Sequence, residues 1–429
     1  MLFNNITIVD ENFEVNTNMY VGVKDGYIKY ISKNKPKEDY GEIYEGAGKL
    51  LLPAFYNAHS HLPMVYMRGY GENLSLMDWL NGKIFPFEAK LTADDIYYGC
   101  MLGVAEMLRF GIASVSEMYI KQDPLGRAFV DSGVKANFCL STLCFGDEDY
   151  KDLHFYTEAM DAMKKYNGLD NDRIKTELCL HAEYTTTEKV AMGIAQVAMD
   201  NNTTFSVHVS ETEAEVEDCK KRHENRSPVK YFHDCGVFKV HATAAHCVHI
   251  DDEDIAILKE DGVTVASCPK SNLKLSSGIC PVTKLLDAGV NVAIGTDSVA
   301  SNNNLNMIEE MRFFSLLAKA VTKDPTVITP AKALYCATRA GAIAQNRNDC
   351  GLIKEGYKAD LTVLDIDRIY MKPEYNMLNN LIYSAQGNDV CLTMVDGKVL
   401  YKDGIYTTLD IEKLNYEVET RRNRILSEL

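Results

Sequence analysis

Short apolar runs alternate with amphipathic, helix-like segments through most of this chain. The apolar runs are rich in small and β-branched residues and have the length of buried strands. Eight of them lie between about residues 50 and 365: 50–57, 112–117, 135–142, 174–181, 204–209, 242–247, 263–268 and 291–296. Helical patterns separate them, for example 98–110 and 251–261, each followed by glycine. Regular alternation of strand and helix predicts a parallel sheet, and eight units with polar strand ends favour a closed (β/α)8 TIM-like barrel.

The two ends of the chain carry another pattern, in which Asp-Gly pairs separate alternating apolar residues. Asp25-Gly26 lies near the start, and Asp396-Gly397 and Asp403-Gly404 lie near the end. Asp-Gly in this setting is the strongest short-range signal for a β-hairpin. We therefore predict a small β-sandwich domain formed by both chain termini, from residues 1–50 and 363–429, with a terminal helix in the second part. The barrel would occupy residues 51–362 between them.

Composition and charge narrow the classes of partner. A hydrophobic fraction of 46% is that of an ordinary globular protein, which argues against disorder. The formal net charge of −16 argues against nucleic acid or an anionic membrane as the main partner, because both require clustered Lys and Arg. The one basic cluster, Arg421-Arg422-Asn423-Arg424, falls in the predicted terminal helix, and we interpret it as a solvated helix face. No Gly-x-Gly-x-x-Gly opens a helix, which argues against dinucleotide binding.

Cysteine usage and the absence of long apolar runs bear on location. The twelve cysteines include no Cys-x-x-Cys pair, and several lie inside apolar runs. Buried free thiols in a reducing compartment fit this pattern better than disulfides. No signal-peptide pattern opens the sequence, and no run approaches 18 apolar residues. We therefore predict a cytoplasmic protein without a membrane partner; an apolar barrel face could support a homo-oligomer, but no segment requires one.

Histidines and carboxylates follow several of the predicted strands. The candidate metal ligands are His59, His61, His208, His246 and Asp297, each at the carboxyl end of an apolar run. Active sites of β/α barrels lie at that end, so these side chains are expected to meet at one mouth. Imidazoles with one carboxylate suit Zn²⁺, although Fe²⁺ and Mn²⁺ accept the same ligands. Such a metal lowers the pKa of a bound water to about 7.

Three further residues have candidate roles in the chemistry. Glu211 lies three residues after His208 and is the candidate general acid, whereas Asp297 can serve both as a ligand and as the base that takes a proton from water. The fourth predicted strand ends in His181 and has its only lysine near its start, which favours one metal ion over a pair bridged by a carboxylated lysine. His181 is then free to contact substrate, although a capping or packing role fits the sequence equally well.

Several segments, read together and in order, resemble the amidohydrolase superfamily and most of all its methylthioadenosine/S-adenosylhomocysteine deaminase group. They are residues 53–61, 208–212, 244–249, 271–275, 295–305 and 358–361. The resemblance implies one Zn²⁺ held by His59, His61, His208 and Asp297, with His246 close to the hydroxide. It also implies that Glu211 protonates a purine ring nitrogen before ammonia leaves, that Glu88 binds the ribose hydroxyls, and that His181 contacts substrate.

One departure from that group bears on the substrate. Members that accept S-adenosylhomocysteine carry arginines after the third strand, whereas this chain has none between Arg127 and Arg173. A tail carboxylate without that partner would lose about 1.5 to 3 kcal/mol. We therefore expect methylthioadenosine, adenosine or 5′-deoxyadenosine as the nucleoside substrate, with S-adenosylhomocysteine less favoured. Ser267-Cys268-Pro269 also departs from the group, which often has His-Asn before the proline.

Two other hypotheses remain open at this point. The first keeps the chemistry and replaces the nucleoside with a free base such as guanine or cytosine, or with a halogenated or oxidised ring. The second is a metal-binding protein without catalysis, against which the presence of both Glu211 and Asp297 speaks, since a purely structural site needs no proton-transfer groups.

Overall fold

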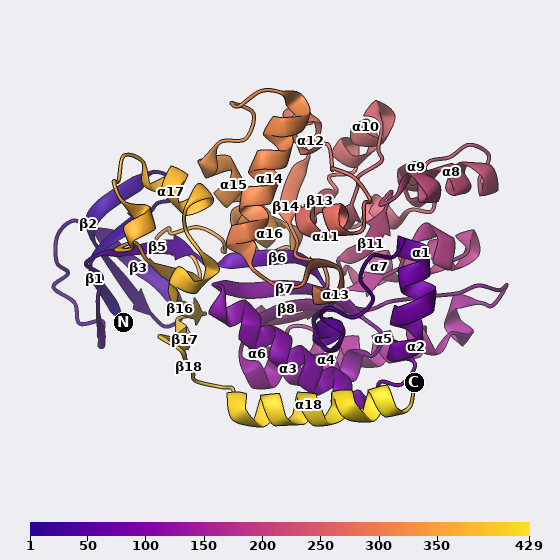
Figure 1. Ribbon diagram of the computed structural model, residues 1–429, viewed down its shortest axis with the longest axis horizontal. Helices are drawn as coiled ribbons and strands as arrows, with labels where there is room; N and C mark the ends of the chain where they lie inside the picture. The colour runs from indigo at the N-terminus through magenta and orange to yellow at the C-terminus, as the bar shows by residue number, and fades with distance from the viewer.

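The structure is a computed structural model that describes residues 1–429. Eight strand positions form a closed barrel, and strands from both termini form a separate sheet beside it (Figure 1). The (β/α)8 barrel with a small terminal β-sandwich is therefore confirmed. No helix is both long enough and apolar enough to cross a membrane.

The barrel consists of two parallel sheets that meet at both edges. Its strands are β6 (Phe55–Ser60), β7 (Ile112–Tyr119), β8 (Lys135–Leu140), β9 (Ile174–Thr176), β10 (Leu178–Cys179), β11 (Phe205–Val209), β12 (Ala242–His246), β13 (Thr264–Ser267) and β14 (Asn291–Ile294). One edge closes where the Asp297 amide donates to the His59 carbonyl at 3.0 Å, and the other where the His181 amide donates to the Thr142 carbonyl at 3.1 Å. Closure brings the carboxyl ends of all the strands to one mouth.

Two predicted strands are divided in the structure. The run 50–57 contains the end of β5 (Lys49–Pro53), which belongs to the terminal sheet, and the start of β6, which belongs to the barrel. Hydrophobicity alone cannot separate them, because both strands are buried. The run 174–181 breaks at Glu177 into β9 and β10, so that β9 pairs with β8 and β10 pairs with β11.

The terminal sheet joins the two ends of the chain. It comprises β1 (Leu2–Val9), β2 (Val15–Lys24), β3 (Tyr27–Ser32), β4 (Ile43–Glu45), β5, β15 (Leu361–Asp365), β16 (Val390–Val395), β17 (Lys398–Lys402) and β18 (Ile405–Tyr406). The three Asp-Gly pairs form its tight turns, and both residues of each pair have positive φ, for example 54° at Asp25 and 83° at Gly26. Strands from the two chain ends share one core, with Phe3 packed in the same cluster as Leu392.

Helices surround the barrel and extend over its mouth (Figure 1). They are α1 (Leu76–Trp79), α2 (Phe85–Glu88), α3 (Ala93–Arg109), α4 (Gln122–Ser132), α5 (His154–Tyr166), α6 (Leu169–Asp172), α7 (Glu188–Asn201), α8 (Glu213–Arg222), α9 (Pro228–Asp234), α10 (Asp252–Glu260), α11 (Pro269–Lys274), α12 (Val282–Ala288), α13 (Val299–Asn302), α14 (Met307–Thr322), α15 (Pro330–Ala337), α16 (Arg339–Ala344), α17 (Met377–Tyr383) and α18 (Ile411–Ser427). The helix expected at 98–110 starts earlier, because Thr92 and Asp95 form a capping box.

The terminal helix α18 lies along α3 at the outside of the barrel (Figure 1). Arg424 reaches the buried Asp95 of α3 at 2.6 Å, and Arg421 reaches it at 3.3 Å. Two of the three clustered arginines therefore anchor the helix, and the interpretation of this cluster as a solvated face was wrong for them. The sequence could not show this, because their partner lies more than 300 residues away.

All twelve cysteines are free and buried.

Candidate active site

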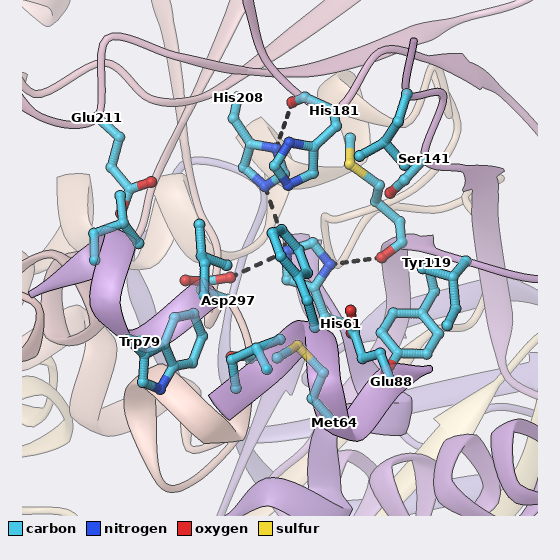
Figure 2. A pocket seen from close by; sticks show the side chains of 18 of the residues that line it. His61, Met64, Trp79, Glu88, Tyr119, Ser141, His181, His208, Glu211 and Asp297 are labelled. Atoms are coloured by element: carbon cyan, nitrogen blue, oxygen red, sulfur yellow. Dashed lines mark hydrogen bonds and ion pairs between the residues drawn. The ribbon is translucent and has the colours of Figure 1, made fainter. Parts of the chain in front are cut away.

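The predicted ligands meet at the mouth of the barrel. His59 ends the β6 region with His61 just beyond it, His208 lies on β11, His246 ends β12, and Asp297 follows β14. The ligand atoms of His59, His61 and His208 all lie within 4.8 Å of one another, and so do those of His59, His246 and Asp297. Figure 2 shows His61, His208 and Asp297 facing one another. The structure thus brings together four strand ends that are up to 238 residues apart in the chain, from His59 to Asp297.

In His61 and His208, a hydrogen bond at Nδ1 turns Nε2 toward this cluster. His61 Nδ1 lies 2.5 Å from the Met118 carbonyl, and His208 Nδ1 lies 2.6 Å from the His181 carbonyl. In each ring Nδ1 therefore carries the hydrogen, and the Nε2 lone pair points inward. The two Nε2 atoms are only 3.4 Å apart. Two lone pairs at this distance repel each other unless a cation lies between them.

His59 provides the clearest indication that the donors fit a metal ion. Its side chain is buried, and its Nε2 atom has no hydrogen-bond partner. Burial lowers the pKa of His59 to about 4 and the pKa of His208 well below its ordinary value, so both rings are neutral near pH 7, the form in which imidazole can bind a metal ion. Burial also lowers the pKa of His61, but its contacts with the adjacent Asp297 carboxylate outweigh burial, and the pKa is raised to about 9. A cation bound between His61 and Asp297 would replace the proton on His61.

Asp297 is held in its ionised form. One oxygen, Oδ1, lies 3.3 Å from His61 Nε2 and 3.6 Å from His59 Nε2. The other, Oδ2, accepts hydrogen bonds from Ser301 Oγ at 2.9 Å and from Ser271 Oγ. Burial raises the pKa of this carboxyl, but its contacts with the histidines lower it well below the ordinary value. The two serines therefore direct one oxygen toward the cluster and leave the other outside it.

Glu211 and His246 lie together at the edge of the cluster. Glu211 Oε2 is 3.8 Å from His246 Nε2, and its Oε1 accepts from Ser277 Oγ at 3.2 Å. His246 Nδ1 lies 2.8 Å from the side-chain oxygen of Asn272. Burial raises the pKa of Glu211, which favours the protonated form that a general acid needs.

The backbone that carries Glu211 is fixed by a second carboxylate. Glu215, in the first turn of α8, accepts the amide hydrogens of Ser210 at 2.9 Å and Glu211 at 2.7 Å. Thr212 caps the same helix in a capping box with Glu215. The Thr212 side chain accepts the Glu215 amide hydrogen, and the Glu215 side chain accepts the Thr212 amide hydrogen. The loop between β11 and α8 therefore holds Glu211 in one place relative to the barrel.

A cavity of about 720 Å³, open solvent included, adjoins the cluster. Most of its lining is apolar, and a segment containing α1 and α2 contributes Trp79, Leu80 and Ile84. Glu88 and His181, which were predicted to contact substrate, both line it (Figure 2). None of the lining residues is Lys or Arg.

Most of the chain matches a known protein family. The family model described as "Amidohydrolase family" matches residues 50–400, and the model of the BsNagA composite domain matches residues 1–47. The chain belongs to the amidohydrolase family. It is 40% identical to the 5-methylthioadenosine/S-adenosylhomocysteine deaminase of Dictyoglomus thermophilum, over 92% of each chain. It is 39% identical to the protein of the same name from Acetivibrio thermocellus, over 95% of this chain and 94% of that one.

Solved structures extend this likeness. A zinc-bound adenosine deaminase from Xanthomonas campestris is 30% identical, covers 99% of this chain and 98% of its own, and superposes with a TM-score of 0.93. An atrazine chlorohydrolase from Arthrobacter aurescens TC1, complexed with zinc, has a TM-score of 0.91 at 20% identity, which shows the shared fold. This amidohydrolase is therefore a deaminase of the methylthioadenosine/S-adenosylhomocysteine deaminase group, a hydrolase of C–N bonds with a metal-binding histidine cluster.

The structure also supplies residues that sequence reasoning passed over. Ser271 and Asn272 belong to a segment that carried the resemblance, but only their contacts with Asp297 and His246 show what they do. Tyr119, at the end of β7, lines the cavity of the amidohydrolase, and its place at a strand end was the available signal. The departure at Ser267-Cys268 does not reach the cavity, because neither residue lines it.

Proposed function

We propose that this protein is a zinc-dependent aminohydrolase of adenosine-type nucleosides that carry no amino-acid tail. The observation that carries the proposal is the pairing of two carboxylates in one cavity: Glu211 beside the histidine cluster, and Glu88 on the other side of His61 in Figure 2. The first suits proton delivery to a purine ring, and the second suits two vicinal hydroxyl groups. The names of the relatives support an adenosine-type substrate.

His59, His61, His208 and Asp297 would hold the single zinc ion. When bound, zinc supplies Lewis acidity that lowers the pKa of water to about 7. Asp297 takes a proton from the attacking water at Oδ1, the oxygen that the serines leave free. Glu211 delivers a proton to the ring nitrogen. His246 is held by Asn272, and its Nε2 atom lies 3.8 Å from Glu211 Oε2, where it orients the water. Asp297 passes the proton taken from water to the amino group, which leaves as ammonia, and the proton of the new hydroxyl group returns to Glu211, so the product is the inosine analogue.

Glu88 is expected to determine recognition of the sugar. Replacing it with Gln removes a charged acceptor, so kcat/KM for adenosine should fall roughly tenfold to hundredfold, mostly through KM. Burial raises the pKa of Glu88 to about 7, so its carboxylate form increases as the pH rises from 6 to 8. The ratio of kcat/KM between wild type and E88Q should therefore grow over that range. A ratio that stays constant with pH would contradict this role.

Because no Lys or Arg lines the cavity, we expect nucleosides without an amino-acid tail to be preferred. We expect kcat/KM for adenosine, methylthioadenosine and 5′-deoxyadenosine to exceed that for S-adenosylhomocysteine by roughly tenfold to hundredfold, measured by ammonia release. Leu143 lines the cavity just after β8, and Leu143→Arg should narrow this gap by offering the tail carboxylate a partner. Equal turnover of S-adenosylhomocysteine and adenosine by the wild type would overturn the preference.

The same panel tests the proposal as a whole. Guanine and cytosine belong in it, because the cavity could also admit a free base. Release of ammonia from the bases alone would remove Glu88 from its role and overturn the nucleoside assignment. Zinc-loaded protein that released ammonia from none of these compounds would exclude this substrate class.

A further inference from the structure

Tyr119 places an unpaired hydroxyl group in the cavity. It is the last residue of β7, its side chain is 2% exposed, and its hydroxyl has no hydrogen-bond partner in the protein. Its backbone is firmly held, because it pairs with Leu140 of β8 and its carbonyl accepts from the Ser141 amide at 2.8 Å. A buried hydroxyl without a partner is unfavourable, so its presence in a cavity lining indicates a ligand atom that completes it.

Glu88 lies beside this hydroxyl, and its carboxylate is a hydrogen-bond acceptor. Figure 2 shows the Tyr119 ring next to Glu88 at one side of the cavity. The Tyr119 hydroxyl lies close enough to the Glu88 carboxylate for the two groups to interact, although no hydrogen bond of ordinary distance and angle joins them. Burial, followed by the charge of Glu88, raises the pKa of Tyr119 well above its ordinary value. Tyr119 is therefore a donor at every working pH, and Glu88, when ionised, is an acceptor only.

A vicinal diol matches this pair of groups. Each hydroxyl of a diol donates one hydrogen bond and accepts others, so one diol can give its hydrogens to a carboxylate while an oxygen accepts from a phenol. A free base offers no such pair at this position. Phenylalanine would fill the same volume and leave no unpaired group, so packing alone does not account for tyrosine here.

We propose that Tyr119 is a second sugar-binding residue, whose hydroxyl donates to a ribose hydroxyl that in turn donates to Glu88. This inference rests on the proposed function, because it requires a nucleoside in the cavity. It makes the carboxylate and the phenol a two-part receptor for the ribose diol. Tyr119 then discriminates ribonucleosides from nucleosides that lack the hydroxyl it contacts.

The test compares Tyr119→Phe with wild type on three substrates: adenosine, 2′-deoxyadenosine and 3′-deoxyadenosine. We expect Y119F to raise KM for adenosine about threefold to tenfold and to leave kcat within twofold, because one neutral hydrogen bond is lost in binding. For the deoxynucleoside that lacks the contacted hydroxyl, the KM values of Y119F and wild type should agree within twofold. Equal losses on all three substrates, or no loss on any, would overturn the proposal.

Two matched variants exclude a general effect of removing a buried hydroxyl. Tyr66 and Tyr231 are also buried with unpaired hydroxyl groups, but neither lines the cavity. Y66F and Y231F should leave KM for all three nucleosides unchanged, and thermal unfolding should show all three variants folded. If they raise KM for adenosine as Y119F does, the effect is structural and the proposal fails.

The outcomes also separate this inference from the proposed function. A wild-type enzyme that deaminates adenosine while Y119F matches it in every KM would refute only the role of Tyr119. A wild-type enzyme that deaminates no nucleoside would refute both. If E88Q and Y119F each raise KM for adenosine and the double variant loses less than the product of the two, the groups act on one diol.

Discussion

Glu211→Gln is expected to lower kcat for adenosine by roughly 10²- to 10⁴-fold, the usual contribution of a positioned general acid. Gln fills the same space and still accepts from Ser277, but it has no acidic proton for the ring nitrogen. The zinc content should stay at wild-type level, because Glu211 lies beside His246 and outside the predicted ligand set. Steady-state ammonia release, with zinc measured on the same samples, checks both statements.

The control for Glu211 is two residues away. Glu213 lies in the first turn of α8 and is exposed, so Glu213→Gln removes the same charge from a neighbouring position without touching the cavity. Its kcat should remain within about twofold of wild type. An E211Q enzyme with normal kcat would show that protons reach the substrate by another route, and an E211Q enzyme without zinc would show that the residue supports the metal.

His59→Ala is expected to abolish stable zinc binding and to lower activity by about a thousandfold or more, because a catalytic metal contributes several kcal/mol of transition-state stabilisation. His59 is the residue whose buried Nε2 has no partner in the protein, so its most direct function is as a ligand. Zinc per chain should fall well below that of wild type after dialysis against a chelator. Thermal unfolding should then no longer respond to added zinc, since a ligand that binds only the folded state raises its stability.

His154 provides the comparison for His59. It lies at the start of α5, is exposed and is remote from the cluster, so His154→Ala should keep both zinc and activity. Wild-type protein stripped of zinc should lose activity and regain it when zinc is restored, whereas H59A should not recover. Full activity in metal-free wild type would contradict the entire metal assignment.

Local pattern accounts for much of what could be predicted here. Asp25-Gly26 needs two successive positive φ values, and few residue pairs tolerate that conformation, so a hairpin could be located without any partner strand. His59 and His61 could be proposed as metal ligands because they lie two residues apart at the end of a buried strand and other histidines lie at the ends of further strands. Where the pattern failed, two strands met without a polar interruption, as at Pro53 and Phe55, or one strand changed neighbours, as at Glu177.

Contacts between segments far apart in the chain could not be predicted from the sequence. Ser271 bonds to Asp297 across 26 residues, and Arg424 bonds to Asp95 across 329. Nothing in the neighbourhood of either serine or arginine specifies its partner, because the pairing depends on how the barrel closes and where α18 lies. The same holds for Glu88 and Tyr119, which reach one cavity from α2 and β7.

The sequence by itself determined the order of strands and helices, the hairpins and the identity of the candidate ligands, because these follow from periodicity, turn conformation and residue chemistry over a few positions. Tertiary structure alone decided which nitrogen of each histidine faces the cluster, which oxygen of Asp297 is free and which hydroxyl in the cavity lacks a partner. Hydrogen bonds have narrow ranges of distance and angle, so these features are fixed only when the whole barrel sets the positions of the atoms.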